Sequence, residues 1–150
     1  MRTPASIAGH PIHPMLVPIA IGCFVFSFAS DIICLASGST QPWNMLAYYT
    51  MVGGIIGALA AALFGFADLF SLPAGIARST GVAHMSLNLV IVVIYIVNAW
   101  MRHGQPQSMQ LPMLLSLVTI VGLLISGWLG GKLVYELGVA VGPAPPPPSR

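Results

Sequence analysis

The sequence predicts an all-α polytopic membrane protein whose four transmembrane helices form an up-down-up-down bundle. Three observations predict this fold. Of 150 residues, 57% are hydrophobic and only 5% are charged, whereas soluble domains are about 25% charged. The mean hydropathy is +0.90. Four apolar stretches each reach the roughly 20 residues that a helix needs to cross a bilayer. We expect one transmembrane domain, 1–142, and a disordered tail, 143–150, with five prolines.

The first two helices are predicted at about residues 15–36 and 45–69. Pro14 fits the first turn of a helix, where its missing N–H costs nothing. A signal peptide is the alternative for the first stretch, but the stretch is long for one, Asp31 interrupts its end and three further spans follow. In the second helix, small residues recur every four positions and form a smooth face for close packing; they are Gly53, Gly57, Ala61 and Gly65.

The third and fourth helices are predicted at about residues 82–102 and from 112 to 134 or beyond, with a loop at 71–81. Polar residues of the third helix fall on one stripe, which must face protein or water; they are His84, Asn88, Tyr95 and Asn98. Gly122, Ser126 and Gly130 repeat the four-residue small pattern. Helices two and four are therefore expected to be neighbours, and the sequence shows no convincing internal repeat.

Positive charge predicts how the chain is oriented. With an even number of spans, both termini lie on one side, together with Arg2, Arg78, Lys132 and Arg150, whereas Arg102 lies on the other. The larger count faces the cytoplasm, so we expect a bacterial inner-membrane protein with both termini cytoplasmic. The net charge of +2, without a basic run, excludes nucleic acid as a partner and leaves the lipid bilayer.

This topology brings most ionisable residues into one membrane layer. Ionisable residues in or near spans are candidate site residues; those of this layer are His10, His13, Asp68, His84, Lys132, Tyr135 and Glu136. In the opposite layer, Asp31 and Arg102 are interpreted as a structural polar pair.

The histidines predict a ligand site. His10 and His13 lie in a stiff His-Pro-Ile-His-Pro segment, and His84 comes from another helix. Imidazole binds haem iron and transition metals, so these three histidines predict an axial pair for one haem b. Alternatively, they form a transition-metal site with Asp68. The expected second shell or proton relay consists of Asp68, Tyr135, Glu136, Lys132 and Asn88.

Structural interpretations stand beside these. His13 could cap the first helix, Asp68 could pair with Arg78 or Lys132, Lys132 could pair with Glu136 one turn away, and Tyr135 could anchor the chain at the interface.

The motifs resemble a bacterial family of four-helix membrane proteins known as a domain of unknown function. The resemblance covers about residues 9–142 and rests on H-P-x-H-P at 10–14, G-G-x-L-V-Y at 130–135, and on Asp31, Asp68 and His84. Members joined to Rieske-type or cytochrome-type modules imply a role near electron transfer. Members often carry histidine and glycine where this chain has Leu137 and Ala140.

Three functions compete. The first is a haem- or metal-binding, redox-linked membrane component with a redox partner protein. The second is a structural or assembly subunit of a larger membrane complex. The third is a small proton-coupled transporter that uses Asp68 and His84 and that would have to form a homo-oligomer. The chain has no G-x-S-x-G, H-E-x-x-H or P-loop motif, so it is not predicted to be an enzyme on its own.

Overall fold

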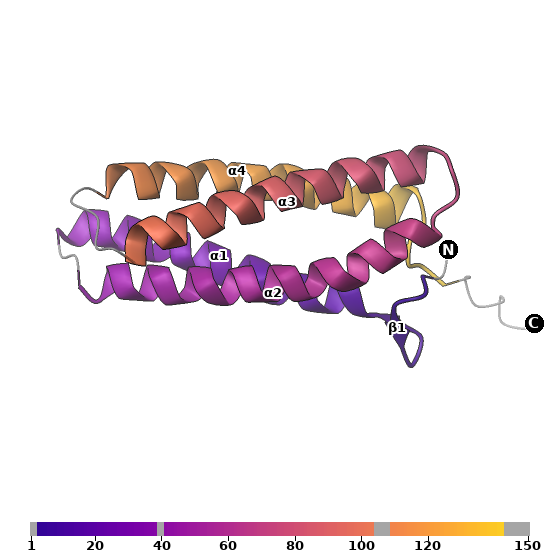
Figure 1. The fold of residues 1–150 in the computed structure, drawn as a ribbon, viewed down its shortest axis with the longest axis horizontal. Coiled ribbons are helices and arrows are strands. Elements are labelled where there is room, and N and C mark those ends of the chain that lie inside the picture. The colour runs from indigo at the N-terminus through magenta and orange to yellow at the C-terminus, as the bar shows by residue number, and fades with distance from the viewer. Residues whose placement is uncertain (1–2, 39–40, 104–108, 143–150) are drawn as a thin grey trace, which may run out of the picture.

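The structure, a computed structural model, describes residues 3–38, 41–103 and 109–142. Its long helices are α1 (Ile12–Ser37), α2 (Trp43–Ser71), α3 (Ile76–His103) and α4 (Gln110–Gly131), and α4 continues into a π-helical turn, η1 (Lys132–Glu136). They run up and down in an antiparallel bundle (Figure 1). The predicted all-α polytopic fold is confirmed. The predicted disordered tail, 143–150, lies outside the described residues.

The bundle carries its apolar side chains on the outside. Within the apolar window of each helix, only 17–28% of residues are buried by the chain itself. Large side chains such as Ile19, Leu63 and Leu124 are more than half exposed. The interior holds many of the polar residues, including Asp31, Asn98 and Arg102. This distribution suits lipid as the surrounding solvent, because hydrocarbon cannot satisfy polar groups.

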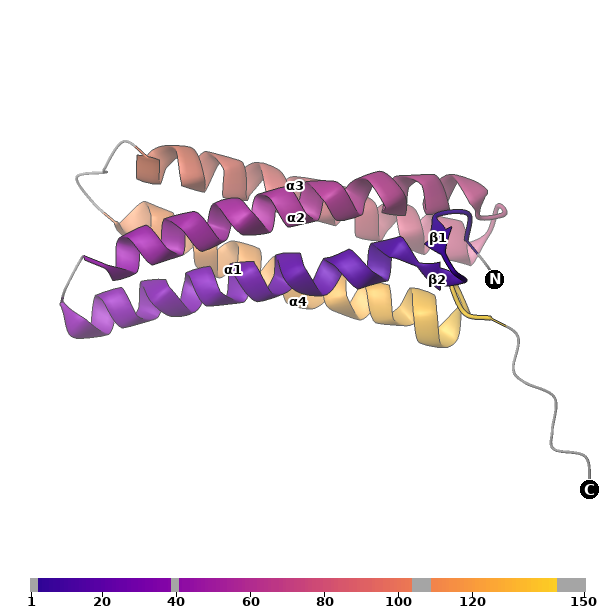
Figure 2. The same ribbon diagram turned by 90° about the horizontal axis from the view of Figure 1, so that it is seen from below.

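Each helix packs against the two helices that flank it, in the order α1, α2, α3, α4 around the bundle (Figures 1 and 2). The small-residue face of α2 lies on α1, since a Cβ added to Gly57 would lie 3.5 Å from Ala20. The small face of α4 lies on α3, since a Cβ added to Gly122 would lie 3.1 Å from Ile91. The prediction that helices two and four are neighbours was therefore wrong. A face of small residues shows that another helix packs closely against it. Which helix this is depends on the connections between the helices.

Helix α3 begins six residues earlier than predicted. Helix α2 ends at Ser71, its C-cap Leu72 is extended before Pro73, and Gly75 turns the chain with φ +146°. The segment 76–81 is helical although it contains polar residues, and Thr80 and Gly81 are buried. The sequence predicts a loop here because a window of hydropathy does not separate a loop from a polar helical turn.

A short hairpin precedes α1. The strands β1 (Ser6–Ile7) and β2 (His10–Pro11) pair antiparallel across a turn in which Ala8 and Gly9 have positive φ. Ala5 N–H donates to Asp68 Oδ1 of α2 at 2.9 Å. This bond fixes the N-terminal segment on the end of the bundle that carries His13 and His84.

The centre of the bundle is held by an aromatic pair. Phe24 of α1 and Tyr95 of α3 are each 1% exposed and stack with ring centroids 3.9 Å apart. A Cβ added to Gly54 of α2 would lie 2.6 Å from the Phe24 ring. Only glycine therefore lets α2 approach the stack without moving it.

Gly54→Ala is expected to lower the free energy of unfolding by about 1–3 kcal/mol, the usual cost of overpacking a core. Gly22→Ala is the matched control, because nothing lies within 4 Å of its added Cβ, and alanine is the better helix former. The measurement is unfolding by sodium dodecyl sulfate in mixed micelles, followed by circular dichroism. Equal stability of the two variants would contradict the close approach of Gly54.

Candidate functional site

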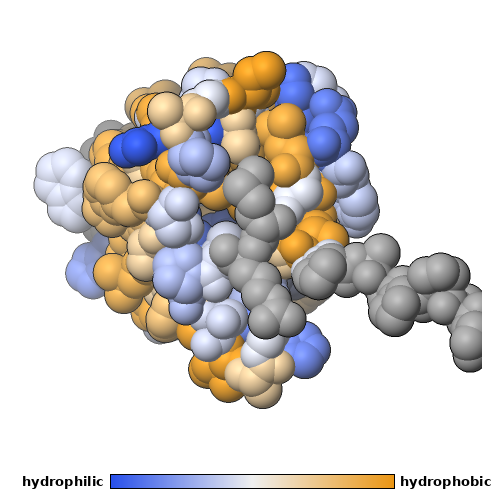
Figure 3. Space-filling model, turned by 90° about the vertical axis from the view of Figure 1, so that its right-hand side faces the viewer, coloured by the Kyte–Doolittle hydropathy of each residue, from blue (hydrophilic) through white to orange (hydrophobic). Residues whose placement is uncertain are grey.

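A cavity of about 480 Å³ lies between the helical hairpin α1–α2 and the helical hairpin α3–α4, at the end that carries the N-terminal strands. Most of its lining is apolar, including Val17, Ile21 and Leu123. Its polar lining residues are Thr3, His13, Asp68, His84, Asn88 and Ser126. The volume falls within the roughly 300–1,000 Å³ of small-molecule and cofactor sites. Figure 3 views this end of the bundle, where hydrophilic side chains lie among apolar ones.

His13 is the second residue of α1 and packs against α2. Its Nδ1 donates to the carbonyl oxygen of Ala61 at 2.8 Å. Gly65 makes room for the ring, because an added Cβ would lie 2.7 Å from Nδ1. The helix begins after Pro11 without a side-chain cap. His13 therefore connects two helices and does not cap its own.

His84 packs in a similar way between α3 and α4. Its Nδ1 donates to the carbonyl oxygen of Ser126 at 3.0 Å, and an added Cβ at Gly130 would lie 3.3 Å from Cε1. Asn88, one turn along α3, donates to His84 Nε2 at 3.2 Å and to Ser126 Oγ at 2.7 Å. The predicted polar stripe of α3 thus faces the interior.

The two imidazoles face one another across the cavity end of the bundle. Their ring centroids are 6.4 Å apart and their planes are perpendicular. A carbonyl oxygen can only accept a hydrogen bond, so each Nδ1 carries the proton. In the neutral rings, each Nε2 is then the unprotonated nitrogen, which is the arrangement that a histidine ligand needs; that of His84 accepts the hydrogen bond from Asn88.

Asp68 lines the same cavity and is 9% exposed. Its Oδ1 accepts the Ala5 N–H, so the carboxylate anchors the N-terminal segment. Neither of the expected partners, Arg78 and Lys132, forms an ion pair with it in the described part of the chain, whereas Asp31 and Arg102 pair with one another.

Four predicted site residues lie away from the cavity. His10 is exposed, and its Nδ1 bonds to Ala8 O of its own turn at 3.1 Å. Tyr135 is 90% exposed, and Glu136 is also exposed. Lys132 lies with Nζ 5.6 Å from the centroid of the Trp128 ring, within cation–π range. Lys132, Tyr135 and Glu136 belong to the π-helical turn η1, and none of the three lines the cavity.

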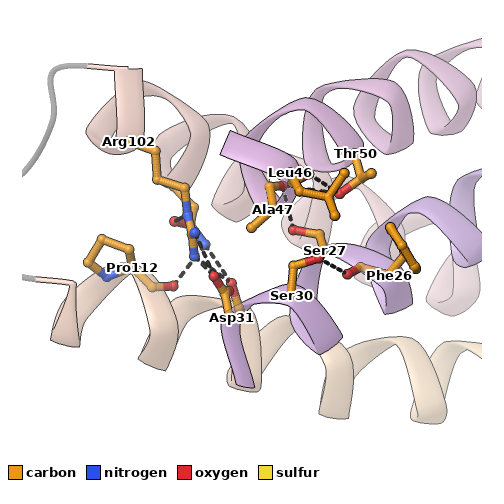
Figure 4. Close-up of polar contacts among 11 residues, drawn as sticks. Phe26, Ser27, Ser30, Asp31, Leu46, Ala47, Thr50, Arg102 and Pro112 are labelled. Atoms are coloured by element: carbon orange, nitrogen blue, oxygen red, sulfur yellow. Dashed lines mark hydrogen bonds and ion pairs between the residues drawn. The ribbon is translucent and has the colours of Figure 1, made fainter. Parts of the chain in front are cut away.

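Asp31 and Arg102 meet at the opposite end of the bundle (Figure 4). The guanidinium donates from Nη1 and Nη2 to the two carboxylate oxygens, both at 2.7 Å. It also donates from Nε to Asn98 Oδ1 at 3.0 Å and from Nη2 to Ser116 Oγ at 3.2 Å. Asn98 in turn donates to the carbonyl oxygen of Pro112 at 2.9 Å. The guanidinium has five N–H groups, and four hydrogen bonds run from it to the side chains of Asp31, Asn98 and Ser116.

Within residues 3–38, 41–103 and 109–142, no three His, Cys, Asp or Glu side chains converge closely enough to hold a metal ion. The predicted topology placed His13 and His84 in one layer. It did not identify the groups that position them, which are Gly65, Gly130 and the carbonyls of Ala61 and Ser126. A signal was present, because both small-residue repeats end in these glycines. In the sequence, such repeats predict helix contacts but not the clearance that a ring needs.

Comparison with known proteins identifies a family but no characterised relative. The family described as "Predicted membrane protein (DUF2231)" matches residues 9–143, which agrees with the resemblance found in the sequence motifs. No curated protein and no solved structure matches the chain.

Proposed function

The chain belongs to the DUF2231 family of predicted membrane proteins, and from that premise we propose that it is a redox-linked membrane component that binds haem b through His13 and His84. The observation that carries the proposal is the histidine pair. Two imidazoles from different hairpins lie 6.4 Å apart at an apolar cavity, and both have Nδ1 bonded to a carbonyl oxygen.

The hydrogen bonds from the two Nδ1 atoms to backbone carbonyl oxygens support a ligand role for both rings. A histidine that binds a metal usually donates its other ring N–H to a carbonyl or carboxylate, which fixes its tautomer and orientation. His13 and His84 both have this bond. Asn88 keeps two other acceptors, His84 O at 2.8 Å and Ser126 Oγ at 2.7 Å, so His84 Nε2 can be released to a ligand at little cost.

The number of donors favours haem over a bare transition-metal ion. Protein sites for bare ions generally use three or more side-chain ligands, and no such group converges among the described residues. Haem brings four nitrogen donors of its own macrocycle, so His13 and His84 would be enough to hold it. His10 and Asp68, the other predicted ligands, are occupied in holding the N-terminal segment.

When bound, haem supplies one-electron transfer. The chain's own part is to orient the two imidazoles, to surround the site with apolar side chains and to exclude water. We further propose that the histidine end faces the cytoplasm of a bacterial inner membrane. Arg78 and Lys132 lie at this end, whereas Arg102 at the other end is neutralised by Asp31 and does not act as a free topogenic charge.

The experiment is an absorption spectrum of detergent-purified protein that was expressed with ample haem supply, recorded oxidised and then reduced with dithionite. We expect a Soret band and a sharp α-band on reduction, and haem in about equal amount to protein by the pyridine haemochrome assay. A flat visible spectrum under these conditions contradicts the proposal and favours the assembly or transporter function.

His10→Ala is the matched control for this experiment, because His10 is exposed and bonds only within its own turn. It is expected to keep the spectrum of the unchanged protein. Loss of the spectrum in His10→Ala alone would move the ligand assignment from His13 to His10.

A further inference from the structure

The hydrogen bonds inside the hairpin α1–α2 recur inside the hairpin α3–α4. In the first, His13 donates to the carbonyl oxygen of Ala61. In the second, His84 donates to that of Ser126. Both rings also pack on a glycine one turn further along the second helix, Gly65 in one hairpin and Gly130 in the other. The same two-helix unit therefore holds each imidazole.

A second bond recurs at the far end of each hairpin. Ser27 Oγ donates to the carbonyl oxygen of Ala47 at 2.8 Å, and Asn98 Nδ2 donates to that of Pro112 at 2.9 Å. The α3 residues lie 71 positions after their α1 equivalents in the sequence. The α4 residues follow their α2 equivalents by one constant number of positions (47 to 112, 61 to 126, 65 to 130). The two bonded residues are 20 positions apart in the first hairpin and 14 in the second, so the second hairpin is shorter only in its turn.

Three pairs of equivalent residues touch or face one another across the centre of the bundle. They are His13 with His84, Phe24 with Tyr95, and Asp31 with Arg102. A residue that meets its own equivalent must lie on the axis that relates the two copies. Since α1 and α3 run in the same direction, this axis runs along the bundle, the geometry of parallel repeats in membrane proteins.

We infer that the chain consists of two equivalent helical hairpins related by a pseudo-two-fold axis, and that His13 and His84 bind one metal centre on this axis as equivalent ligands, one from each hairpin. The ligand part of this inference rests on the proposed function. Two of the axial pairs are closed by direct contact, a ring stack at 3.9 Å and an ion pair at 2.7 Å. The third, the histidine pair, borders the cavity.

The axis defines the class of ligand. Two equivalent hairpins present two identical imidazoles to one atom, and the described residues add no further His, Cys, Asp or Glu to them. The ligand must therefore bring its other donors, as a metal-centred tetrapyrrole does. One difference breaks the symmetry. Asn88, which bonds to His84 Nε2, has Val17 as its equivalent (17 to 88), so His13 Nε2 lacks this partner.

The test is a titration of haem-free, full-length protein in detergent with ferric protoporphyrin IX, followed by optical and electron paramagnetic resonance spectra. The variants are His13→Ala, His84→Ala, the double variant and His10→Ala. Both single variants are expected to lose the low-spin, six-coordinate signature to a similar extent, and added imidazole is expected to restore it in each. The double variant should bind at least 10-fold more weakly, and His10→Ala should match the unchanged protein.

The outcomes separate this inference from the proposed function. If the unchanged protein binds the porphyrin and one single variant keeps the full low-spin signature, the shared axial ligation is wrong while haem binding stands. If the unchanged protein binds none, the ligand part fails together with the proposed function. His13→Asn and His84→Asn, which keep a donor near the carbonyl oxygens, replace the alanine variants if the latter do not fold.

Discussion

Asp31→Ala is expected to lower the free energy of unfolding by about 3–5 kcal/mol, the usual cost of breaking a buried ion pair by removing one partner. Arg102 has a side chain that is 0% exposed and gives two of its hydrogen bonds to this carboxylate. Without it, the guanidinium keeps only Asn98 and Ser116. A charge left in this position is expensive, because lipid surrounds the helices and water cannot replace the carboxylate.

The measurement is reversible unfolding by sodium dodecyl sulfate in mixed micelles. Glu136→Ala is the control, because this carboxylate is exposed at the end of η1, and we expect its effect to stay within about 0.5 kcal/mol. A loss of less than 1 kcal/mol for Asp31→Ala would show that the pair is not buried as the structure has it.

The exchanged pair, Asp31→Arg with Arg102→Asp, tests the equivalence of the two hairpins without any ligand. If both positions lie on one pseudo-two-fold axis, an arginine at 31 reaches an aspartate at 102, and at least half of the lost stability returns. Recovery should be incomplete, because Asn98 and Ser116 have Ser27 and Met51 as their equivalents (27 to 98, 51 to 116). An exchanged protein no more stable than Asp31→Ala contradicts the axis.

The fold could largely be predicted because the bilayer imposes it. Spanning helices need a minimum apolar length, and this requirement located all four helices to within a few residues at most ends. The polar stripe of α3 was found because hydrocarbon excludes unsatisfied polar groups. The two-residue strands before α1 gave no comparable signal, because their pairing depends on the positive φ of Ala8 and Gly9 rather than on a periodic pattern.

The internal repeat could not be recognised from the sequence, for a physical reason. The axis fixes which positions meet, but only the histidines of the three axial pairs are identical, while Asp31 and Arg102 are opposite in charge. A complementary pair stabilises the contact better than two like charges would, so the strongest contact across the axis removes the sequence similarity there. The different turn lengths of the two hairpins also prevent a single offset from aligning them.

The candidate site could be predicted in outline only. Topology placed seven ionisable residues in one layer, but it does not give the rotation of each helix about its axis. That rotation directs His13 and His84 to the cavity and leaves Tyr135 at the surface. The groups that hold the rings are glycines and backbone carbonyls. Neither is a metal-binding side chain, so no ligand motif in the sequence includes them.

Gly65→Ala is expected to weaken binding of ferric protoporphyrin IX by about 10–100-fold, the usual effect of disturbing the second shell of a metal site. The added Cβ would lie 2.7 Å from Nδ1 and 2.9 Å from Cε1 of His13. The ring must therefore leave the carbonyl oxygen of Ala61, and its orientation is lost. The measurement is the haem titration described for the histidine variants, with the fold checked by circular dichroism.

Two other glycines, Gly130 of α4 and Gly22 of α1, make this prediction quantitative. Gly130→Ala would place a Cβ 3.3 Å from Cε1 of His84, a milder contact, and Gly22→Ala would meet nothing within 4 Å and lies outside the cavity lining. The loss of affinity should therefore be largest for Gly65→Ala, smaller for Gly130→Ala and absent for Gly22→Ala. Equal affinities for all three folded variants would mean that the glycines serve helix packing alone. The graded order, by contrast, would connect haem affinity to the clearance of each imidazole, because alanine adds the same methyl group in every case.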